Sequence, residues 1–186
     1  AGDTTVVARN VIVATNGYTG ALTPWLRRRI IPIQSQIIVT EAMARDVMEE
    51  LIPRSRMCGD TCRLHHYYRP TPDGTRLLFG GRAGADKKHP RRAGAHLYRR
   101  MTALFPETRG IRITHAWTGI TGYTFDTLPH IGVHDGIHYA AGFCGSGTAL
   151  AAYLGYKIAL RLLGSPEAET VFDFERRAFP TRPLYW

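Results

Sequence analysis

The apolar positions near the start of the chain predict two strands. The run Val11–Ala14 is continuously apolar and mostly β-branched, which is typical of a strand buried on both faces. Asn16 and Gly17 then end the strand with turn residues. Residues 30–40 (IIPIQSQIIVT) are also strand-like, and Pro32 favours an edge strand or an early break.

The middle of the chain predicts a hairpin and two helices. The hairpin pairs residues 63–70 with residues 76–80 around the turn Pro72-Asp73-Gly74. Residues 41–51 are helical in composition. Residues 93–105 predict an amphipathic helix. Its apolar face is formed by Leu97, Met101, Leu104 and Phe105.

The last third predicts strands over 111–119 and 138–141 and a helix over 147–163 with Gly164 as its C-cap. This helix is apolar around nearly its whole circumference, and such helices are normally buried on all sides. We therefore expect the isolated chain to expose apolar surface. The order of elements favours an α/β fold with an α+β insertion.

Composition and charge narrow the class of protein. Hydrophobic residues make up 44% of the 186 residues and charged residues 21%, which excludes a disordered or collagen-like chain. No apolar run is long enough to span a membrane. Three cysteines and the lack of a leader disfavour a disulfide scaffold and favour a cytoplasmic protein.

The net charge of +9 raises the question of nucleic-acid binding. Basic residues gather at Arg27–Arg29 and over 86–100. No signature of a nucleic-acid-binding module accompanies them, so we expect a solvated face or a face covered by an acidic partner, and no nucleic acid.

The glycine-rich stretch 142–148 follows a short apolar strand and precedes a helix. Its glycines allow a sharp turn, and the amides at a helix start favour an electron-rich or anionic ligand. Gly142-x-Cys144 also resembles a nucleophile elbow, but none of the eight histidines follows Cys144, which excludes an α/β-hydrolase.

Two further groups of residues carry candidate chemistry. Four potential metal ligands, Cys58, Cys62, His65 and His66, have a spacing that fits no common zinc pattern, and we predict no metal site. In the hairpin, a side-chain period of two means that only one of Tyr67 and Tyr68 can face a pocket.

Five segments in register resemble one family. They are VIVATNGY, TPWLRRRIIP, HYYRPTPDGTRLLFGGR, WTG leading to TFDTLPHIG, and YAAGFCGSGTALAAYLG. Together they are similar to the FAD-dependent D-amino-acid oxidase-like oxidoreductases, which include glycine and sarcosine oxidases, and in particular to the γ-glutamylputrescine oxidoreductase-like branch.

The resemblance implies FAD as cofactor and the oxidation of a small amine or amino acid, with hydride passing from the carbon next to nitrogen to flavin N5. Substrate-wall candidates are Tyr67, Tyr68 and Arg69. No catalytic side chain is assigned. The implied cofactor-binding residues are Thr15, Asn16, Gly17, Gly142, Phe143, Cys144, Gly145, Ser146, Gly147 and Thr148.

Three departures from the family pattern refine this expectation. The dinucleotide fingerprint is absent, so we expect a partial chain that lacks an N-terminal Rossmann segment. Thr121 stands where glycine-oxidase-like members carry the arginine that holds the substrate carboxylate, which favours a larger amine. Gly119 matches the position of the flavin-tethering cysteine of sarcosine oxidases, so FAD should be non-covalent.

The resemblance also implies a domain division. Residues 1–30 and 111–165 would belong to a Rossmann-like FAD-binding domain, 31–110 to an antiparallel-sheet substrate domain, and 166–186 to a C-terminal tail. The alternative is a non-catalytic fragment or basic interaction module that keeps the fold without cofactor.

Overall fold

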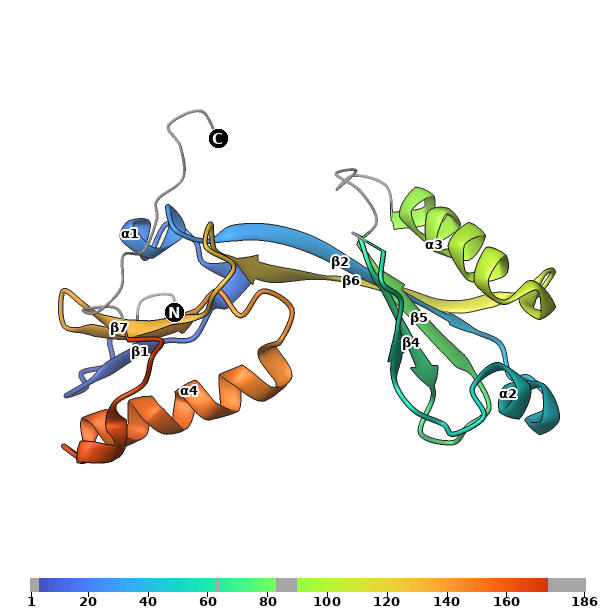
Figure 1. The fold of residues 1–186 in the computed structure, drawn as a ribbon. Coiled ribbons are helices and arrows are strands. Elements are labelled where there is room, and N and C mark those ends of the chain that lie inside the picture. Colours follow the sequence, from blue (N-terminus) through green and yellow to red (C-terminus); the bar gives the residue numbers. More distant parts are fainter. Residues whose placement is uncertain (1–3, 63, 83–89, 174–186) are drawn as a thin grey trace. The chain divides into compact units, whose positions relative to one another are not determined.

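The computed structural model describes residues 4–62, 64–82 and 90–173 (Figure 1). The chain divides into two compact units, each with its own β-sheet. Unit 1 comprises Ala1–Ile33 and Thr121–Trp186, and unit 2 comprises Gln34–Ile120.

Unit 1 is built on a three-stranded sheet in the order β1-β8-β7. The strands are β1 (Val11–Val13), β7 (His130–His134) and β8 (Ile137–Ala141). β1 and β8 are parallel, whereas β7 and β8 form an antiparallel hairpin. The hairpin turns at Asp135 and Gly136, whose φ angles of 50° and 73° suit a tight two-residue turn.

Helices cover both faces of this sheet. On one face lies α4 (Gly147–Leu162), which runs along the sheet in Figure 1 and buries Leu154 and Ile158 against it. The other face packs against α1 (Pro24–Arg27), with Leu26 and Tyr139 in the core. Two 3-10 helices, η1 (Asn16–Tyr18) and η3 (Pro166–Ala168), complete the unit.

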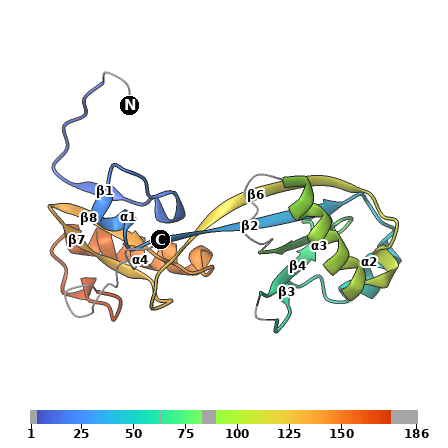
Figure 2. The same cartoon turned by 90° about the horizontal axis from the view of Figure 1, so that it is seen from above.

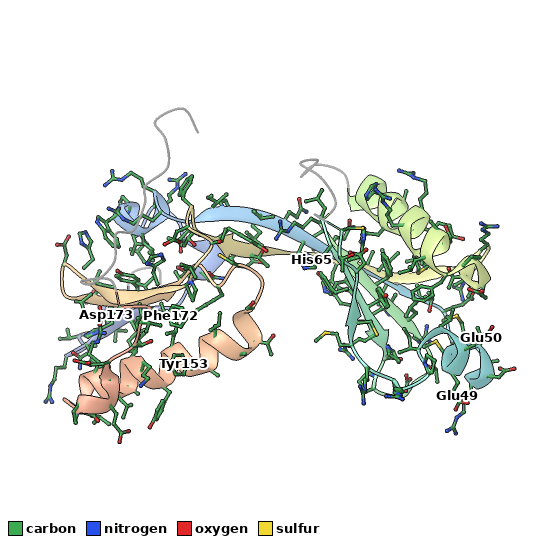
Figure 3. All side chains as sticks on the ribbon, in the orientation of Figure 1. Glu49, Glu50, His65, Tyr153, Phe172 and Asp173 are labelled. Carbon is green, nitrogen blue, oxygen red and sulfur yellow. The ribbon has the colours of Figure 1, made fainter. Side chains whose placement is uncertain are left out.

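Helix α4 ends just before Gly164 as expected, but the C-cap itself is Leu163 and Gly164 is the residue after it. Gly164 has a φ of 69°, and its N–H donates to Arg161 O at 3.1 Å. The N–H of Ser165 donates to Leu160 O at 3.0 Å, which completes a Schellman motif. The chain then returns to β7, where Ile131 N–H donates to Phe172 O and Asp173 forms an ion pair with Arg161 (Figure 3). Residues 174–186 of the expected tail lie outside the described residues.

Unit 2 carries most of a five-stranded sheet in the order β3-β4-β5-β2-β6. The strands are β2 (Ile31–Thr40), β3 (Cys58–Gly59), β4 (His66–Pro70), β5 (Leu77–Gly81) and β6 (Ile113–Tyr123); both β2 and β6 extend across the unit boundary. The helices are α2 (Arg45–Leu51), α3 (Pro90–Leu104) and the 3-10 helix η2 (Pro106–Thr108).

One face of this sheet packs against α2 and α3 (Figure 2), and Phe79 and Leu97 are fully buried there. The predicted amphipathic face contributes Leu97 and Met101 to this core, whereas Leu104 is 44% exposed. Glu49 and Glu50 lie on the outer side of α2 (Figure 3).

The sheets confirm one expectation and correct others. The strand at 11–13 and the tyrosine hairpin lie in different sheets, as the sequence predicts. The prediction that this strand is buried on both faces is wrong for the described chain, because β1 is an edge strand and Val11 and Ile12 are each about half exposed. Pro32 does not make β2 an edge strand; it precedes Gln36, where the ladder with β5 begins.

Strand β7 was not predicted, although the Asp135-Gly136 pair that closes its hairpin is a strong local signal. Among the described residues, no helix is both long enough and apolar enough to cross a lipid bilayer.

Candidate cofactor and substrate site

The cofactor candidates of unit 1 meet where β1 and β8 end. The side-chain Oδ1 of Asn16 accepts the N–H of Gly142 at 2.9 Å, a contact across 126 residues of sequence. Asn16 has a left-handed φ of 41°, a conformation that asparagine tolerates better than most residues. This one hydrogen bond joins the two segments that the sequence analysis assigned to the cofactor.

Two glycines make this close approach possible. A Cβ atom at Gly122 of β6 would lie 2.3 Å from Asn16 Oδ1 and 2.9 Å from Gly17 N. Gly142 has a φ of 77°, and a Cβ there would lie 2.2 Å from Thr124 Cγ2. Sequence reasoning missed Gly122, although a glycine inside a strand signals the close approach of another backbone.

Six amides of the glycine-rich turn, those of all its residues except Phe143, fall into two groups. Three of them donate within the protein, from Gly142 to Asn16, from Cys144 to Gly122 O and from Ser146 to Phe143 O. For the part of the chain that the structure describes, no acceptor lies against the amides of Gly145, Gly147 and Thr148. The donors that remain for a ligand are therefore a subset of those predicted.

The open amides lie at the N-terminal end of α4, a helix of 16 residues. Its first turn carries no acidic residue, so no side-chain charge there offsets the positive end of the helix dipole. Gly145 has a φ of 98°, and a Cβ at this position would meet Tyr123 Oη at 3.2 Å. The turn therefore offers a small, electropositive backbone surface.

The other cofactor candidates have more structural roles. Phe143 is 9% exposed and packs against the core of α4. The Cys144 thiol donates to Gly142 O at 3.0 Å. Thr15 and Ser146 are exposed, and the Thr15 hydroxyl lies 2.9 Å from Thr19 Oγ1.

A buried histidine–carboxylate pair that sequence reasoning missed lies in the segment that contacts Gly142. His130 is fully buried, and its Nε2 lies 2.9 Å from Asp126 Oδ2. Burial disfavours the charged carboxylate, but hydrogen bonds from His130 and from Leu128 N–H outweigh it and lower the pKa of Asp126. The Thr124 hydroxyl donates to Leu128 O at 2.7 Å. Thr124 is also the residue against which Gly142 lies, so it links the Asp126–His130 segment to the turn.

In unit 2 the two tyrosines of β4 lie on opposite faces of the sheet, as their spacing predicts. Tyr68 stacks on Phe79 and meets Phe105 edge-on within the core, where burial raises its pKa. Tyr67 lies on the other face, over Gly80, and its hydroxyl is 2.6 Å from Ser35 Oγ. Tyr67 is therefore the stronger candidate for substrate contact.

Arg69 follows Tyr67 by two positions and shares its face of the sheet. Its side chain is exposed, and Nη1 donates to Pro70 O at 3.1 Å. In unit 1, the hydroxyl of Thr121 donates to Ile33 O at 3.0 Å. A neutral side chain bonded to the backbone thus occupies the position where the resemblance implies a carboxylate-binding arginine.

The residues of the turn fit part of a flavin. The turn has three open amides, and Gly145 avoids a contact with Tyr123 because it has no Cβ. Both features suit the close approach of an electron-rich ring edge. The sequence supplies no glycine fingerprint for the phosphates. The turn could therefore hold the ring end of the cofactor.

A parallel strand pair that ends in a glycine-rich turn before a helix, with a separate antiparallel sheet, is the arrangement of a partial FAD-binding fold. Residues 1–161 match the family model described as FAD dependent oxidoreductase, DAO. The chain belongs to this family, and FAD is the family's cofactor.

Two curated relatives are about equally similar. The chain is 34% identical over 178 residues to a protein named "Probable oxidoreductase OrdL" from Rhizobium meliloti (strain 1021), covering 95% of this chain and 41% of the relative. It is 34% identical over 182 residues to the gamma-glutamylputrescine oxidoreductase of Escherichia coli (strain K12), covering 97% of this chain and 41% of the relative. The chain thus spans about two fifths of their length.

Solved structures show the same fold. The glycine oxidase of Geobacillus kaustophilus aligns with a TM-score of 0.69 at 21% identity, over 93% of this chain and 45% of that one. The L-proline dehydrogenase of P. horikoshii aligns with a TM-score of 0.66 at 21% identity, over 88% and 44%.

Proposed function

We propose that the chain forms part of an enzyme that oxidises an amine with FAD. The observation that carries this proposal is the junction in which Asn16 binds Gly142 while the neighbouring amides at the start of α4 stay open. The Escherichia coli relative, named gamma-glutamylputrescine oxidoreductase, supports an amine as substrate class.

In this proposal each part of the site has a separate role. The amides of Gly145, Gly147 and Thr148 bind the flavin ring without a covalent link and favour negative charge on it. When bound, FAD supplies the chemistry by accepting a hydride equivalent from the carbon next to nitrogen. Tyr67 and Arg69 orient the substrate, and no side-chain base is assigned.

The substrate preference rests on Thr121. Its hydroxyl is engaged with Ile33 O and it carries no charge, so it offers no partner for a substrate α-carboxylate. We infer that an amine without an α-carboxylate is preferred over an α-amino acid. Oxidation of alkylamines and of glycine by the whole protein, compared by kcat/KM, tests this preference.

The dinucleotide-binding part is proposed to come from a Rossmann segment that completes the sheet of unit 1. Support comes from the free edge of β1, where Val11 and Ile12 are about half exposed, and from the relatives, which are more than twice as long.

Purification of the whole protein with FAD tests the function itself. We expect stoichiometric bound flavin, seen by its absorbance, that bleaches when an amine substrate is added without oxygen. A correctly folded protein that holds no flavin even after incubation with FAD would favour a basic interaction module instead.

A further inference from the structure

Three potential metal ligands that belong to no part of the flavin site meet in unit 2, where β3 leads into β4. They are Asp60, Cys62 and His66, and one ligand atom from each lies within 4.8 Å of the others. This set differs from the four potential ligands considered in the sequence, Cys58, Cys62, His65 and His66, for which no metal site was predicted. Asp60 joins the cluster, whereas Cys58 and His65 lie outside it.

The carboxylate of Asp60 is held rigidly by its own loop. Its Oδ1 accepts the N–H of His66 at 2.9 Å and that of Cys62 at 3.1 Å, and its Oδ2 lies 2.6 Å from His66 Nδ1. Hydrogen bonds that orient a ligand in advance strengthen metal sites. Two of the three candidate ligands are therefore preorganised.

Burial around the cluster suits a site with one open side. The side chains of His66 and Asp60 are 7% and 21% exposed, and His66 stacks on Phe79 of the core. Cys62 is exposed, so it provides the entry path and can rotate. In a tetrahedral zinc site the ligand atoms are about 3.3–3.8 Å apart. The Cys62 sulfur therefore has to approach by up to about 1 Å, and the 2.6 Å contact between Asp60 Oδ2 and His66 Nδ1 has to open.

We propose that Asp60, Cys62 and His66 bind a divalent transition-metal cation of the Zn²⁺ type, with water as fourth ligand. Thiolate, imidazole and carboxylate are the ligands that zinc prefers, and the two anionic ligands neutralise its charge. The ion takes the place of the proton between His66 and Asp60. Binding releases the Cys62 thiol proton, while the imidazole proton moves to Nε2.

Cobalt binding to the full chain, freed of any tag and of metal, tests this site. Co²⁺ bound to a thiolate gives a charge-transfer band that carboxylate or imidazole alone does not give. We expect one Co²⁺ per chain with this band, displaced by Zn²⁺. Cys62→Ser should abolish the band and weaken binding at least tenfold, and it leaves the hydrogen bonds of Asp60 and His66 in place.

Two neighbouring variants serve as matched controls. Cys58→Ser and His65→Gln should keep the band and the affinity, because neither residue belongs to the cluster. Three results would overturn the site: no stoichiometric binding, a band that survives Cys62→Ser, or a band that Cys58→Ser removes. Circular dichroism of each variant confirms that its fold is intact.

Discussion

At the scale of single residues, the junction of unit 1 depends on the hydrogen bond from Gly142 to Asn16. Asn16→Ala should destabilise the chain by about 2 kcal/mol, because it leaves the buried amide of Gly142 without an acceptor. Asn16→Asp keeps an acceptor oxygen and should cost less. Urea denaturation measures both, and equal losses for the two variants would argue against this bond as the stabilising contact.

Alanine substitutions at Gly142 and Gly136 distinguish the cost of a steric clash from the cost of a positive φ angle. Both have φ near 75°, but a Cβ at Gly136 meets open space, whereas one at Gly142 meets Thr124 Cγ2 at 2.2 Å. Gly136→Ala should cost about 1 kcal/mol and Gly142→Ala at least about 2 kcal/mol more.

Thr124→Ser in the Gly142→Ala background removes Cγ2 and should recover part of the lost stability, as urea denaturation would show. No recovery would mean that the clash at Thr124 is not the cause of the loss.

Asp60 gives the chain an acid-dependent contribution to stability. Although burial opposes its ionisation, hydrogen bonds from His66 and Cys62 outweigh this and lower its pKa to about 2, from the ordinary 3.8. The folded state therefore holds the charged form more strongly than the unfolded state. This contribution is complete above about pH 4 and is lost as the pH falls toward 2.

The variant Asp60→Asn isolates that contribution. With chelator present, the difference in unfolding free energy between wild type and variant should stay nearly constant from pH 5 to about pH 4 and then shrink toward pH 2. A difference that stays constant over this range would show that the charge of Asp60 does not contribute to stability.

At the scale of elements, alanine substitutions at Gly155 inside α4 and at Gly164 after its end should change the stability in opposite directions. Gly164→Ala places a Cβ at φ 69° in the Schellman motif and should destabilise the chain by about 1 kcal/mol. Gly155→Ala lies inside the helix with open space around its Cβ and should stabilise it by about 0.5–1 kcal/mol. Thermal unfolding followed by circular dichroism compares them, and a shift of the same sign for both would contradict the assignment.

Local chemistry explains which elements could be predicted. The hairpin at Pro72-Asp73-Gly74 and the end of α4 at Gly164 are each specified by residues a few positions apart, and both were predicted. The burial of β1 was not, because it depends on which strands flank it and not on its own apolar sequence.

The same reasoning explains which residues of the candidate site could be predicted from the sequence and which could not. Asn16 and Gly142 were assigned through the family resemblance, and turn chemistry marked them independently. Gly122 was missed although a glycine inside a strand signals a close backbone approach, because the sequence does not say which segment approaches. The pair Asp126–His130 was missed because its role comes from burial, which no short sequence pattern records.

At the scale of the whole molecule, unit 1 exposes apolar surface on more than one element. Besides Val11 and Ile12 of β1, Tyr153 and Tyr156 of α4 are 42% and 56% exposed. Such surface usually signals a partner. Co-expression with a Rossmann segment should therefore increase both the soluble yield and the flavin content of the chain.

The control for this experiment is expression of the chain alone. A monomeric chain that unfolds cooperatively on its own, with a stability of about 5–15 kcal/mol typical of native domains and no gain from the Rossmann segment, would contradict the proposed partnership.

The flavin content of the whole protein carrying Gly145→Val tests the central proposal most directly. Valine at φ 98° is strained and its Cβ would meet Tyr123 Oη at 3.2 Å, so we expect the turn to be displaced and predict soluble protein without bound FAD. Gly136→Val, at a positive φ in open space, provides the matched control and should retain flavin. Stoichiometric FAD in the Gly145→Val protein would contradict the assignment of this turn to the cofactor.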